Sequence, residues 1–379
     1  MWYTINHPPT TFFMNKHQAL LQKYERALRD ELLSDRSAAD SVALFNNWKN
    51  RDTRDRLEIY DNALKNIGHM AGATEHFFGK MQEILNVIKD PVLHFCVITH
   101  STYQPVEFLS VLDCVDVGIL DKDLKSRAIG VLLRNQNDRV RASKNMTLLF
   151  NNYTLFKPFV RPHQKDIAFI AAENGHKDLL TCLNWSPRNP TQQKIFFTAC
   201  CVGGLLDHIK QLNVSNSELL HNGMLGALIN GHSQVAEYIS SLPTVQWDKV
   251  DKFEALIYAK DSLFDTLLGH YKTHPKYPSI IRQTVYLSLV RNSGSFSKIL
   301  EHTPMDGIES MVRIVVASRS KTNMKILLSH IGDQHFNKGL EDLEFKHVQW
   351  AQEYRTQLQQ RVLKKAVKSA PTVVRKSKM

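Results

Sequence analysis

The chain has 379 residues, of which 43% are hydrophobic and 22% charged, which suffices for a folded core and excludes a wholly disordered protein. It has no uncharged apolar run of about eighteen residues and begins without a secretory pattern, so we expect neither a membrane span nor a signal peptide. The net charge of +11 is uneven, because residues 361–379 hold seven Lys and Arg and no acid, leaving 41 basic and 37 acidic residues before them.

Residues 1–90 carry apolar residues at the spacing of amphipathic helices. One such stripe consists of Leu20, Tyr24, Leu28 and Leu32. Ser34–Asp35 and Asp52–Thr53 have the residue types that precede helices, and we expect breaks there. We predict three or four helices that cap the N-terminal end of a longer array. An independent functional domain over these residues is the alternative.

A stretch of two short helices joined by a tight turn recurs along residues 161–335. The sequence DIAFIAAENGHKDLLTCL (166–183) aligns with KIFFTACCVGGLLDHIKQL (194–212), MLGALINGHSQVAEYISSL (224–242) and FEALIYAKDSLFDTLLGHY (253–271). In this alignment a small residue recurs every 28 positions at Ala171, Ala199, Ala227 and Ala255, and the series continues with Ser288 and Ala317.

Each unit follows the same physical pattern. The small residue allows the next helix to approach closely, and Gly175, Gly203 and Gly231 are predicted to end the first helix in the left-handed conformation. Apolar residues three and four apart then give the second helix one buried face. Because a two-helix unit cannot bury that face by itself, we predict that the units stack as an all-α solenoid with helical caps.

These residues resemble the ankyrin repeat. DIAFIAAENGHKDLLTCL and ALINGHSQVAEYI are similar to that family's helix–turn–helix with its Asn-Gly-His turn. The resemblance is weaker over residues 91–160, where Leu93–His94 corresponds to the family's Leu-His pair and Cys96 to a small residue. The spacing of 28 is shorter than the family's repeat of about 33, so we expect shortened fingers between the helix pairs.

The resemblance also implies roles at the turns. In the family, the histidine of the turn is a structural hydrogen-bonding residue. This implies that Gly175 and His176 in one unit, and Gly231 and His232 in another, are structural turn residues. Contact of either histidine with a ligand is the alternative.

Four basic residues stand at the beginning of predicted first helices. They are the candidate binding residues Lys165, Lys194, Lys252 and Arg282. Counted from the alanine column, Lys165 lies six positions before its alanine, Lys194 five and Lys252 three. Because two residues turn a helix by about 200°, we expect a regional positive bias that favours an acidic partner, and no single stripe.

Catalytic motifs are few. Cys114 is flanked by Asp113 and Asp116, which would raise the pKa of its thiol, so we interpret it as a packed cysteine. His270 and His274 have metal-like spacing but no third ligand, and no glycine-rich phosphate loop or CxxC pair occurs. We therefore predict no catalytic residue, no metal and no cofactor. The dispersed cysteines favour a reducing, intracellular compartment.

Residues 336–379 are predicted to form a capping helix followed by a basic tail. Beyond Ala370–Pro371 we expect disorder. Three interpretations of the tail stay open: a solvated terminus, a nuclear-import or nucleic-acid signal built on Lys364–Lys365 and RKSK at 375–378, or attraction to an anionic membrane.

The leading hypothesis is a non-enzymatic scaffold that binds a partner protein on a curved face lined by first helices. Ankyrin units with short fingers and extra helical ends resemble the ankyrin proteins of intracellular bacteria and large DNA viruses, which implies an effector that acts on host proteins in the cytoplasm. The rival hypothesis is a cysteine hydrolase or transferase in residues 1–160 with the array as its docking arm. A nucleic-acid adaptor acting through the tail is a third.

Overall fold

The computed structural model describes residues 16–34, 42, 45–46, 50–68, 75–134, 138–249, 252–291, 293–304, 308–341 and 343–369. Over these residues the chain is helical and contains no β-strand, which confirms the predicted all-α class. The chain divides into two compact units, Met1–Leu205 (unit 1) and Leu206–Met379 (unit 2). None of the described helices is both long and apolar enough to cross a membrane.

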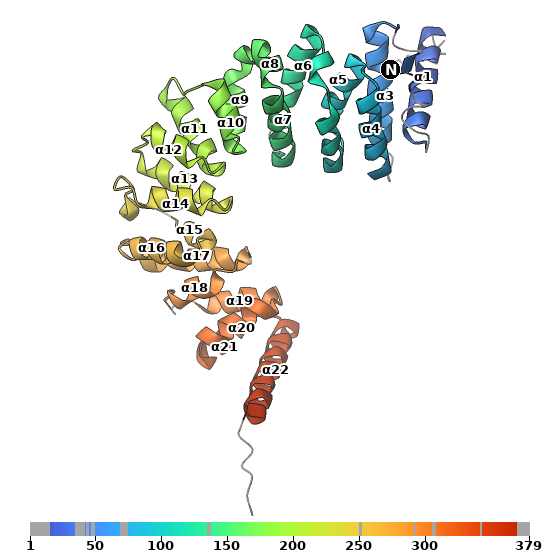
Figure 1. Cartoon of the computed structure of the whole chain (residues 1–379). Coiled ribbons are helices and arrows are strands. Elements are labelled where there is room, and N and C mark those ends of the chain that lie inside the picture. The colour runs from blue at the N-terminus through green and yellow to red at the C-terminus, as the bar shows by residue number, and fades with distance from the viewer. Residues whose placement is uncertain are drawn as a thin grey trace, which may run out of the picture. The chain divides into compact units, whose positions relative to one another are not determined.

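Unit 1 is a succession of short helices in chain order (Figure 1). They are α1 (Lys16–Leu32), α3 (Thr53–Gly68), α4 (Glu75–Val87), α5 (Pro91–His100), α6 (Lys122–Leu132), α7 (Arg139–Asn151), α8 (Tyr153–Val160), α9 (Gln164–Glu173), α10 (Lys177–Leu183) and α11 (Pro190–Val202), with short 3₁₀ segments η1 (Val106–Cys114), η2 (Val117–Ile119) and η3 (Arg161–His163). Helices near in sequence pack together: α1 on α3, α3 on α5, α5 on α6, α7 on α9 and α9 on α11.

Unit 2 follows the same principle. Its helices are α12 (Leu206–Leu212), α13 (Ser217–Ile229), α14 (Ser233–Ser240), α15 (Ala255–Tyr258), α16 (Asp261–Lys272), α17 (Tyr277–Val290), α18 (Phe296–Glu301), α19 (Glu309–Ala317), α20 (Lys321–His330), α21 (Asp333–Leu340) and α22 (Phe345–Ser369), with the 3₁₀ segment η4 (Trp247–Lys249). Here α13 packs on α14 and α15, α15 on α17, α18 on α20, and α19 on α21 and α22.

Side-chain caps fix where several helices begin. The predicted break at Asp52–Thr53 is confirmed, since α3 begins at Thr53 and the Asp52 carboxylate accepts a hydrogen bond of 2.9 Å from the Arg54 amide. Such a carboxylate or amide oxygen satisfies a backbone N–H that has no partner within the helix. The same arrangement begins α5, α6, α7, α11 and α13, where the capping residues are Asp90, Asp121, Asp138, Asn189 and Asn216.

A single turn motif ends α9, α11 and α13. In α9 the Gly175 amide donates to the Ala172 carbonyl and the His176 amide donates to the Ala171 carbonyl, over 3.2 and 2.9 Å. This pair of bonds is the Schellman motif, which needs a left-handed residue after the helix. Gly175 supplies it with φ of 75°.

The turn after α11 shows that the sequence alignment was one residue out at this helix. The left-handed residue there is Gly204 with φ of 75°, whereas Gly203, which the sequence alignment assigned to that role, has φ of −89°. The Leu205 amide donates to the Cys200 carbonyl over 2.9 Å, so Cys200 is the counterpart of Ala171. The prediction of Ala199 and Gly203 was wrong by one residue, because two adjacent glycines both satisfied the pattern.

The turn after α13 matches the prediction. Gly231 has φ of 80°, and the His232 amide donates to the Ala227 carbonyl over 2.9 Å. In α17 the Ser293 amide donates to the Ser288 carbonyl over the same distance, and Ser288 is fully buried.

Two other members of the small-residue series do not fit. Ala255 begins a helix of only four residues. Ala259, which follows Ala255 at the spacing that separates Gly175 from Ala171, has extended backbone with φ of −68° and ψ of 143°. Ala317 is exposed at the end of α19 and cannot mediate close helix packing. The predicted interval of 28 is therefore not regular, because the equivalent residues Ala171, Cys200 and Ala227 lie 29 and 27 positions apart and Ala255 does not continue the series.

The turns after α9 and α11 can approach each other closely because position 203 is a glycine. A β-carbon placed on Gly203 would lie 1.9 Å from the Ala172 carbonyl oxygen and 2.8 Å from the Gly175 nitrogen. The backbone ending α11 thus lies directly against the backbone ending α9. A larger residue at position 203 would separate the two turns.

The C-terminal helix α22 packs on α19, as the sequence predicted for this region. Ala351 is fully buried, and the Tyr354 hydroxyl donates to the Lys321 carbonyl over 3.0 Å. Arg355 pairs with Asp333 and lies 5.1 Å from the centre of the Phe336 ring. The tail from residue 370 lies outside the described residues, so the expectation of disorder there is untested.

Candidate binding surface on α9 and α11

The corrected register changes the relation between two basic candidate residues. Lys165 lies six residues before Ala171, and Lys194 lies six residues before Cys200, the counterpart of Ala171. The two lysines therefore occupy the same position on α9 and α11, which pack against each other in unit 1. The sequence alignment had placed Lys165 six and Lys194 five positions before the small residue, because it was one residue out at α11.

Lys165 lies beside one ring of a cluster of three aromatic side chains. The Trp185 ring stands edge-on to both Phe169 and Phe196, with ring centres 5.3 Å apart in each pair. Aromatic pairs prefer this edge-to-face arrangement. The Lys165 ammonium nitrogen lies 5.7 Å from the centre of the Phe169 ring, within the range of a cation–π interaction.

The aromatic cluster is only partly covered. Phe196 is buried, whereas Phe169 and Trp185 are half-buried. Both lysines are exposed, and Ile195, which follows Lys194 on α11, is 48% exposed. We refer to this set as the α9–α11 surface and define it as Lys165, Phe169, Trp185, Lys194 and Ile195.

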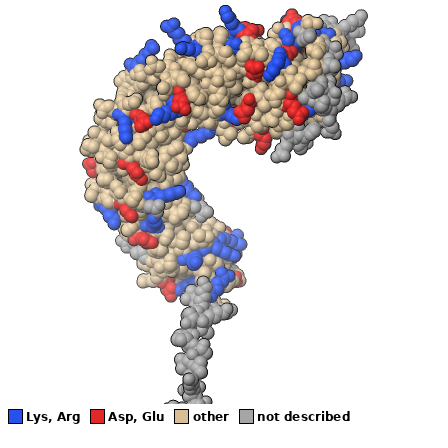
Figure 2. All heavy atoms as spheres, viewed as in Figure 1, with Lys and Arg blue, Asp and Glu red and all other residues tan. Residues whose placement is uncertain are grey.

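The composition of the α9–α11 surface differs from its surroundings. On the face of unit 1 shown in Figure 2, basic and acidic side chains alternate. Exposed ion pairs of unit 1 include Lys144 with Asp113 at 2.7 Å and Arg139 with Glu173 at 3.8 Å. Such exposed pairs contribute little to stability or recognition. Partly exposed aromatic and aliphatic side chains beside cations are the usual constituents of a protein interface.

The other two basic candidates belong to unit 2. Arg282 lies six residues before Ser288 and so has the Lys165 position on α17, where its Nε donates to the Pro278 carbonyl over 3.0 Å. Lys252 is exposed and precedes the short helix α15, and its backbone accepts a hydrogen bond from the buried His221 ring. Lys165 and Lys194 hold equivalent positions on two packed helices, whereas Lys252 has no equivalent position.

The turn histidines act through their backbones in the structure. The amides of His176 and His232 close the turns after α9 and α13. The His176 ring also reaches α7, with its Nε2 3.2 Å from the Ser143 hydroxyl oxygen. Burial lowers the pKa of His176, so its ring is neutral at physiological pH.

The thiols in the first 160 residues lack the electrostatics of a nucleophile. Cys96 is 2% exposed, and burial raises its pKa, with Asp61 and Asp90 adding to the effect. At Cys114, burial and then the Asp113 carboxylate raise the pKa. A catalytic cysteine needs a lowered pKa because the thiolate is the nucleophile. Both thiols are therefore protonated at neutral pH.

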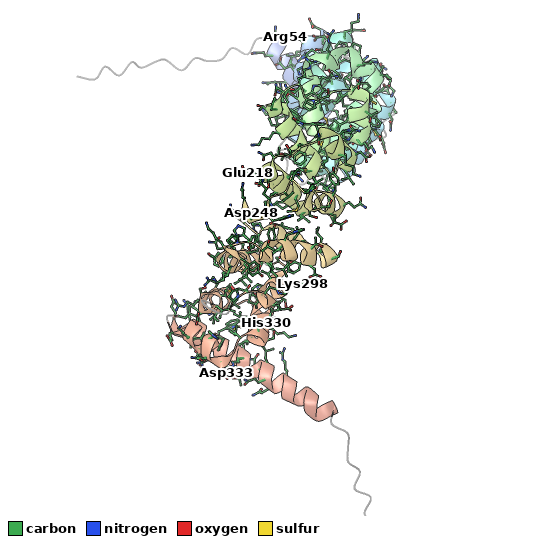
Figure 3. The ribbon with its side chains drawn as sticks, turned by 90° about the vertical axis from the view of Figure 1, so that its left-hand side faces the viewer. Arg54, Glu218, Asp248, Lys298, His330 and Asp333 are labelled. Atoms are coloured by element: carbon green, nitrogen blue, oxygen red, sulfur yellow. The ribbon has the colours of Figure 1, made fainter. Side chains whose placement is uncertain are left out.

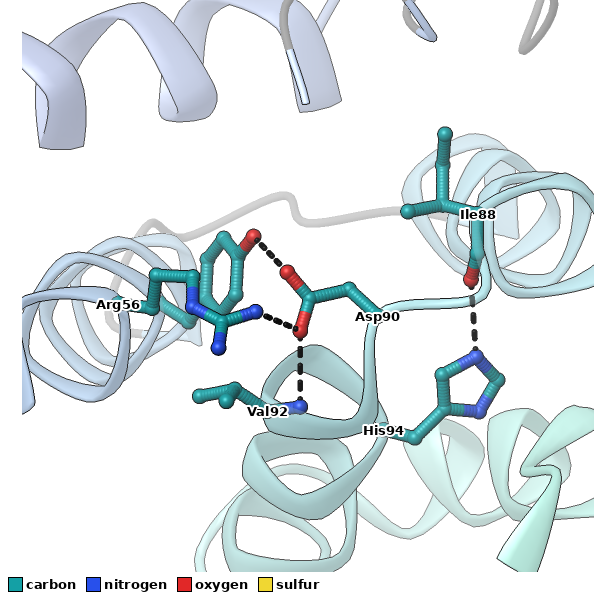
Figure 4. A network of polar contacts seen from close by, with 6 residues as sticks. Arg56, Ile88, Asp90, Val92 and His94 are labelled. Atoms are coloured by element: carbon teal, nitrogen blue, oxygen red, sulfur yellow. Dashed lines mark hydrogen bonds and ion pairs between the residues drawn. The ribbon is translucent and has the colours of Figure 1, made fainter. Parts of the chain in front are cut away.

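A buried polar cluster of unit 1 surrounds Asp90 (Figure 4). Its carboxylate accepts hydrogen bonds from the Val92 amide at 2.9 Å, the Arg56 guanidinium at 3.0 Å and the Tyr60 hydroxyl at 2.8 Å. Burial, and then the Asp90 charge, raise the pKa of Tyr60, which keeps this hydroxyl protonated as a donor. Since every oxygen of the carboxylate is engaged with the protein, the cluster fixes the start of α5.

His94 extends this cluster and is also structural. It is fully buried, and its Nδ1 accepts a hydrogen bond of 3.0 Å from the Asp116 amide. The proton is therefore on Nε2, which donates to the Ile88 carbonyl over 3.0 Å (Figure 4). Burial lowers the pKa of His94, consistent with a neutral ring. Both ring nitrogens are occupied in joining the segments on either side of α5.

Three members of the α9–α11 surface were missed from the sequence. Phe169 and Ile195 are ordinary apolar positions in the repeat pattern, and Trp185 lies in the connection after α10. The sequence signal for Phe169 and Ile195 is that each lies close to one of the two lysines. The signal for Trp185 is its place in the connection between two helix pairs. Among the residues that the structure describes, no group of three or more His, Cys, Asp or Glu is placed to hold a metal ion. Comparison of the chain with protein-family models, curated proteins and solved structures gave no match.

Proposed function

We propose that this protein is a non-enzymatic recognition scaffold, built from ankyrin-like helix–turn–helix units, and that it binds a partner protein through the α9–α11 surface. The proposal depends on one observation above all. Lys165 and Lys194 hold the same position on two packed helices, next to partly exposed aromatic and aliphatic side chains. Repetition of one turn motif is the device by which such units present equivalent residues in a row.

The chemistry of the surface defines the partner. Trp185 and Phe169 offer rigid apolar area, and Ile195 adds an aliphatic contact. Aromatic side chains of this kind supply most of the binding energy at protein interfaces. The two ammonium groups favour an acidic rim on the partner and accelerate its association. We therefore propose a protein partner that carries an apolar side chain flanked by Asp or Glu.

The thiol environments argue against the enzyme hypothesis. Cys96 and Cys114 both have raised pKa values, caused first by burial. The buried polar cluster at Asp90 uses its hydrogen-bonding groups on the protein itself. These features support structural roles for Cys96, Cys114 and Asp90.

Site-specific photo-crosslinking in cells tests the proposal. A benzophenone amino acid at position 195 is expected to capture one discrete protein, and the same amino acid at Thr181, exposed on α10, serves as the matched control. Charge reversal by Lys165→Glu and Lys194→Glu should abolish the product at position 195. Equal capture from both positions, or capture that survives charge reversal, would refute the α9–α11 surface as the binding site.

A further inference from the structure

The second half of α22 extends beyond the helices that hold its first half. Contacts of the described side chains are concentrated near Ala351, Tyr354 and Arg355. After Arg355 the helix continues to Ser369, and Figures 1 and 3 both show this part running past the packed helices of unit 2, beginning in Figure 3 near Asp333. Fourteen helical residues span about 21 Å, enough for almost four turns.

The sequence of this extension divides into two faces at helical pitch. At about 100° per residue, one half of the helix circumference holds five apolar positions together with the uncharged Thr356, Gln359 and Ser369; the apolar five are Leu358, Val362, Leu363, Ala366 and Val367. Four basic positions fall on the opposite side: Arg361, Lys364, Lys365 and Lys368. From residue 361 to the end of the chain there is no Asp or Glu.

We propose that the extension of α22 binds the surface of an anionic lipid bilayer, lying parallel to it with the apolar half at the level of the acyl-chain boundary. A helix with one apolar face and a cationic face has this mode of binding, because apolar burial and attraction to anionic headgroups act together. The charge pattern specifies the occupant, since an uncharged lipid surface would leave four cations without complementary charge. The inference concerns unit 2 and does not depend on the α9–α11 surface.

The basic face also predicts that binding to the bilayer depends on salt concentration. The attraction between basic residues and anionic headgroups falls off within a Debye length, about 8 Å at physiological ionic strength. Binding through this extension should therefore weaken as salt is added, while a purely apolar association would not. An acidic groove on a protein could also take a basic amphipathic helix, and the experiment below separates that case.

Vesicle flotation with the full chain tests the proposal. Wild-type protein should float with phosphatidylcholine vesicles that contain phosphatidylserine and remain unbound to phosphatidylcholine alone. Neutralisation by Lys364→Gln, Lys365→Gln and Lys368→Gln should weaken binding by about a hundredfold. The matched control removes the same charge elsewhere in unit 2 by Lys260→Gln, Lys272→Gln and Lys276→Gln, and should bind as the wild type does.

A second measurement tests the orientation and guards against altered folding. A nitroxide label at position 363 should be shielded from a water-soluble relaxation agent on vesicles, and a label at position 364 should stay accessible. Failure of the wild-type chain to bind anionic vesicles would overturn the proposal. The acidic groove of a protein would then be the remaining partner for the helix. Equal loss in the triple variant and its control, or equal accessibility at the two labelled positions, would also overturn the proposal.

Discussion

The amide of His176 donates a hydrogen bond of 2.9 Å to the carbonyl of Ala171, five residues earlier, and His232 makes the same bond to Ala227. This bond requires the left-handed glycine that precedes each histidine. The residue whose carbonyl accepts this bond is a common reference from which positions in different helix–turn–helix repeats can be counted. Measured from it, Lys165 and Lys194 are equivalent, although the alanine column placed them one residue apart.

Replacement of Gly203 should destabilise unit 1 strongly. In Gly203→Ala the new β-carbon would meet the Ala172 carbonyl oxygen and the Gly175 nitrogen, neither of which can move without shifting backbone. We expect the free energy of unfolding to fall by about 3 kcal/mol. Urea denaturation followed by circular dichroism measures this change.

Gly130→Ala is the matched control for that experiment. Gly130 lies within α6, and a β-carbon there would meet no atom within 4 Å. Alanine should therefore stabilise the helix by up to about 1 kcal/mol. If both variants changed stability by the same amount, the close approach of the two turns would not exist in solution.

Acid should destabilise the protein through His221. Burial lowers the pKa of His221 from 6.5 to about 4, so on acidification the unfolded chain binds a proton at this residue before the folded chain does. The neutral ring thus contributes stability above about pH 7, and this contribution is lost as the pH falls towards 4. The loss should approach about 3 kcal/mol.

Comparison with His221→Gln isolates that contribution, because glutamine does not titrate. The difference in free energy of unfolding between wild type and variant should shrink by the same amount between pH 7.5 and pH 4. Parallel pH profiles for the two proteins would show that His221 titrates normally in the folded state.

Removal of the Asp90 carboxylate should be among the most damaging substitutions in unit 1. In Asp90→Ala the Arg56 guanidinium loses its ion pair, the Tyr60 hydroxyl loses its acceptor and α5 loses its cap. Breaking a buried pair by deleting one partner costs about 3–5 kcal/mol. Asp90→Asn keeps an acceptor for the Val92 amide and should be milder in thermal or urea unfolding; equal damage by both substitutions would contradict the role assigned to the cap.

The cysteines should differ sharply in reactivity. Cys182 is exposed, whereas Cys96, Cys200 and Cys201 are buried and burial raises the pKa of each. Brief treatment of the folded protein with iodoacetamide at neutral pH should therefore alkylate Cys182 first, as read by peptide mass spectrometry. Rapid, selective alkylation of Cys96 or Cys114 would instead revive the hypothesis of a cysteine enzyme.

The helical class and the turn positions in α9 and α13 could be predicted because each depends on local chemistry. Apolar spacing defines amphipathic helices, and a glycine after the helix permits the left-handed cap. At α11 the same rule failed, since Gly203 and Gly204 are adjacent and only the hydrogen bond of Leu205 to Cys200 distinguishes them. Ala317 failed for another reason: its small side chain fitted the pattern, but its position on α19 is exposed.

The candidate site was predictable in part. Lys165 and Lys194 were predicted to begin their helices, which holds for Lys165 in the first turn of α9 but was wrong for Lys194, the fifth residue of α11. Their equivalence required the turn geometry. Trp185 could not be assigned to the same site from sequence, because it follows α10 and reaches Phe169 and Phe196 only through the packing of α9 on α11. Contacts between residues on separate elements are set by packing, which periodicity alone does not specify.

The most direct test of the recognition function is the dissociation constant for the partner captured at position 195, measured with wild type and with the double variant Lys165→Glu, Lys194→Glu. The control reverses two exposed lysines on α6 and α8, in Lys122→Glu, Lys157→Glu. We predict at least about tenfold weaker binding for the α9–α11 variant and unchanged binding for the control. Equal affinities for wild type and the α9–α11 variant would contradict the central claim.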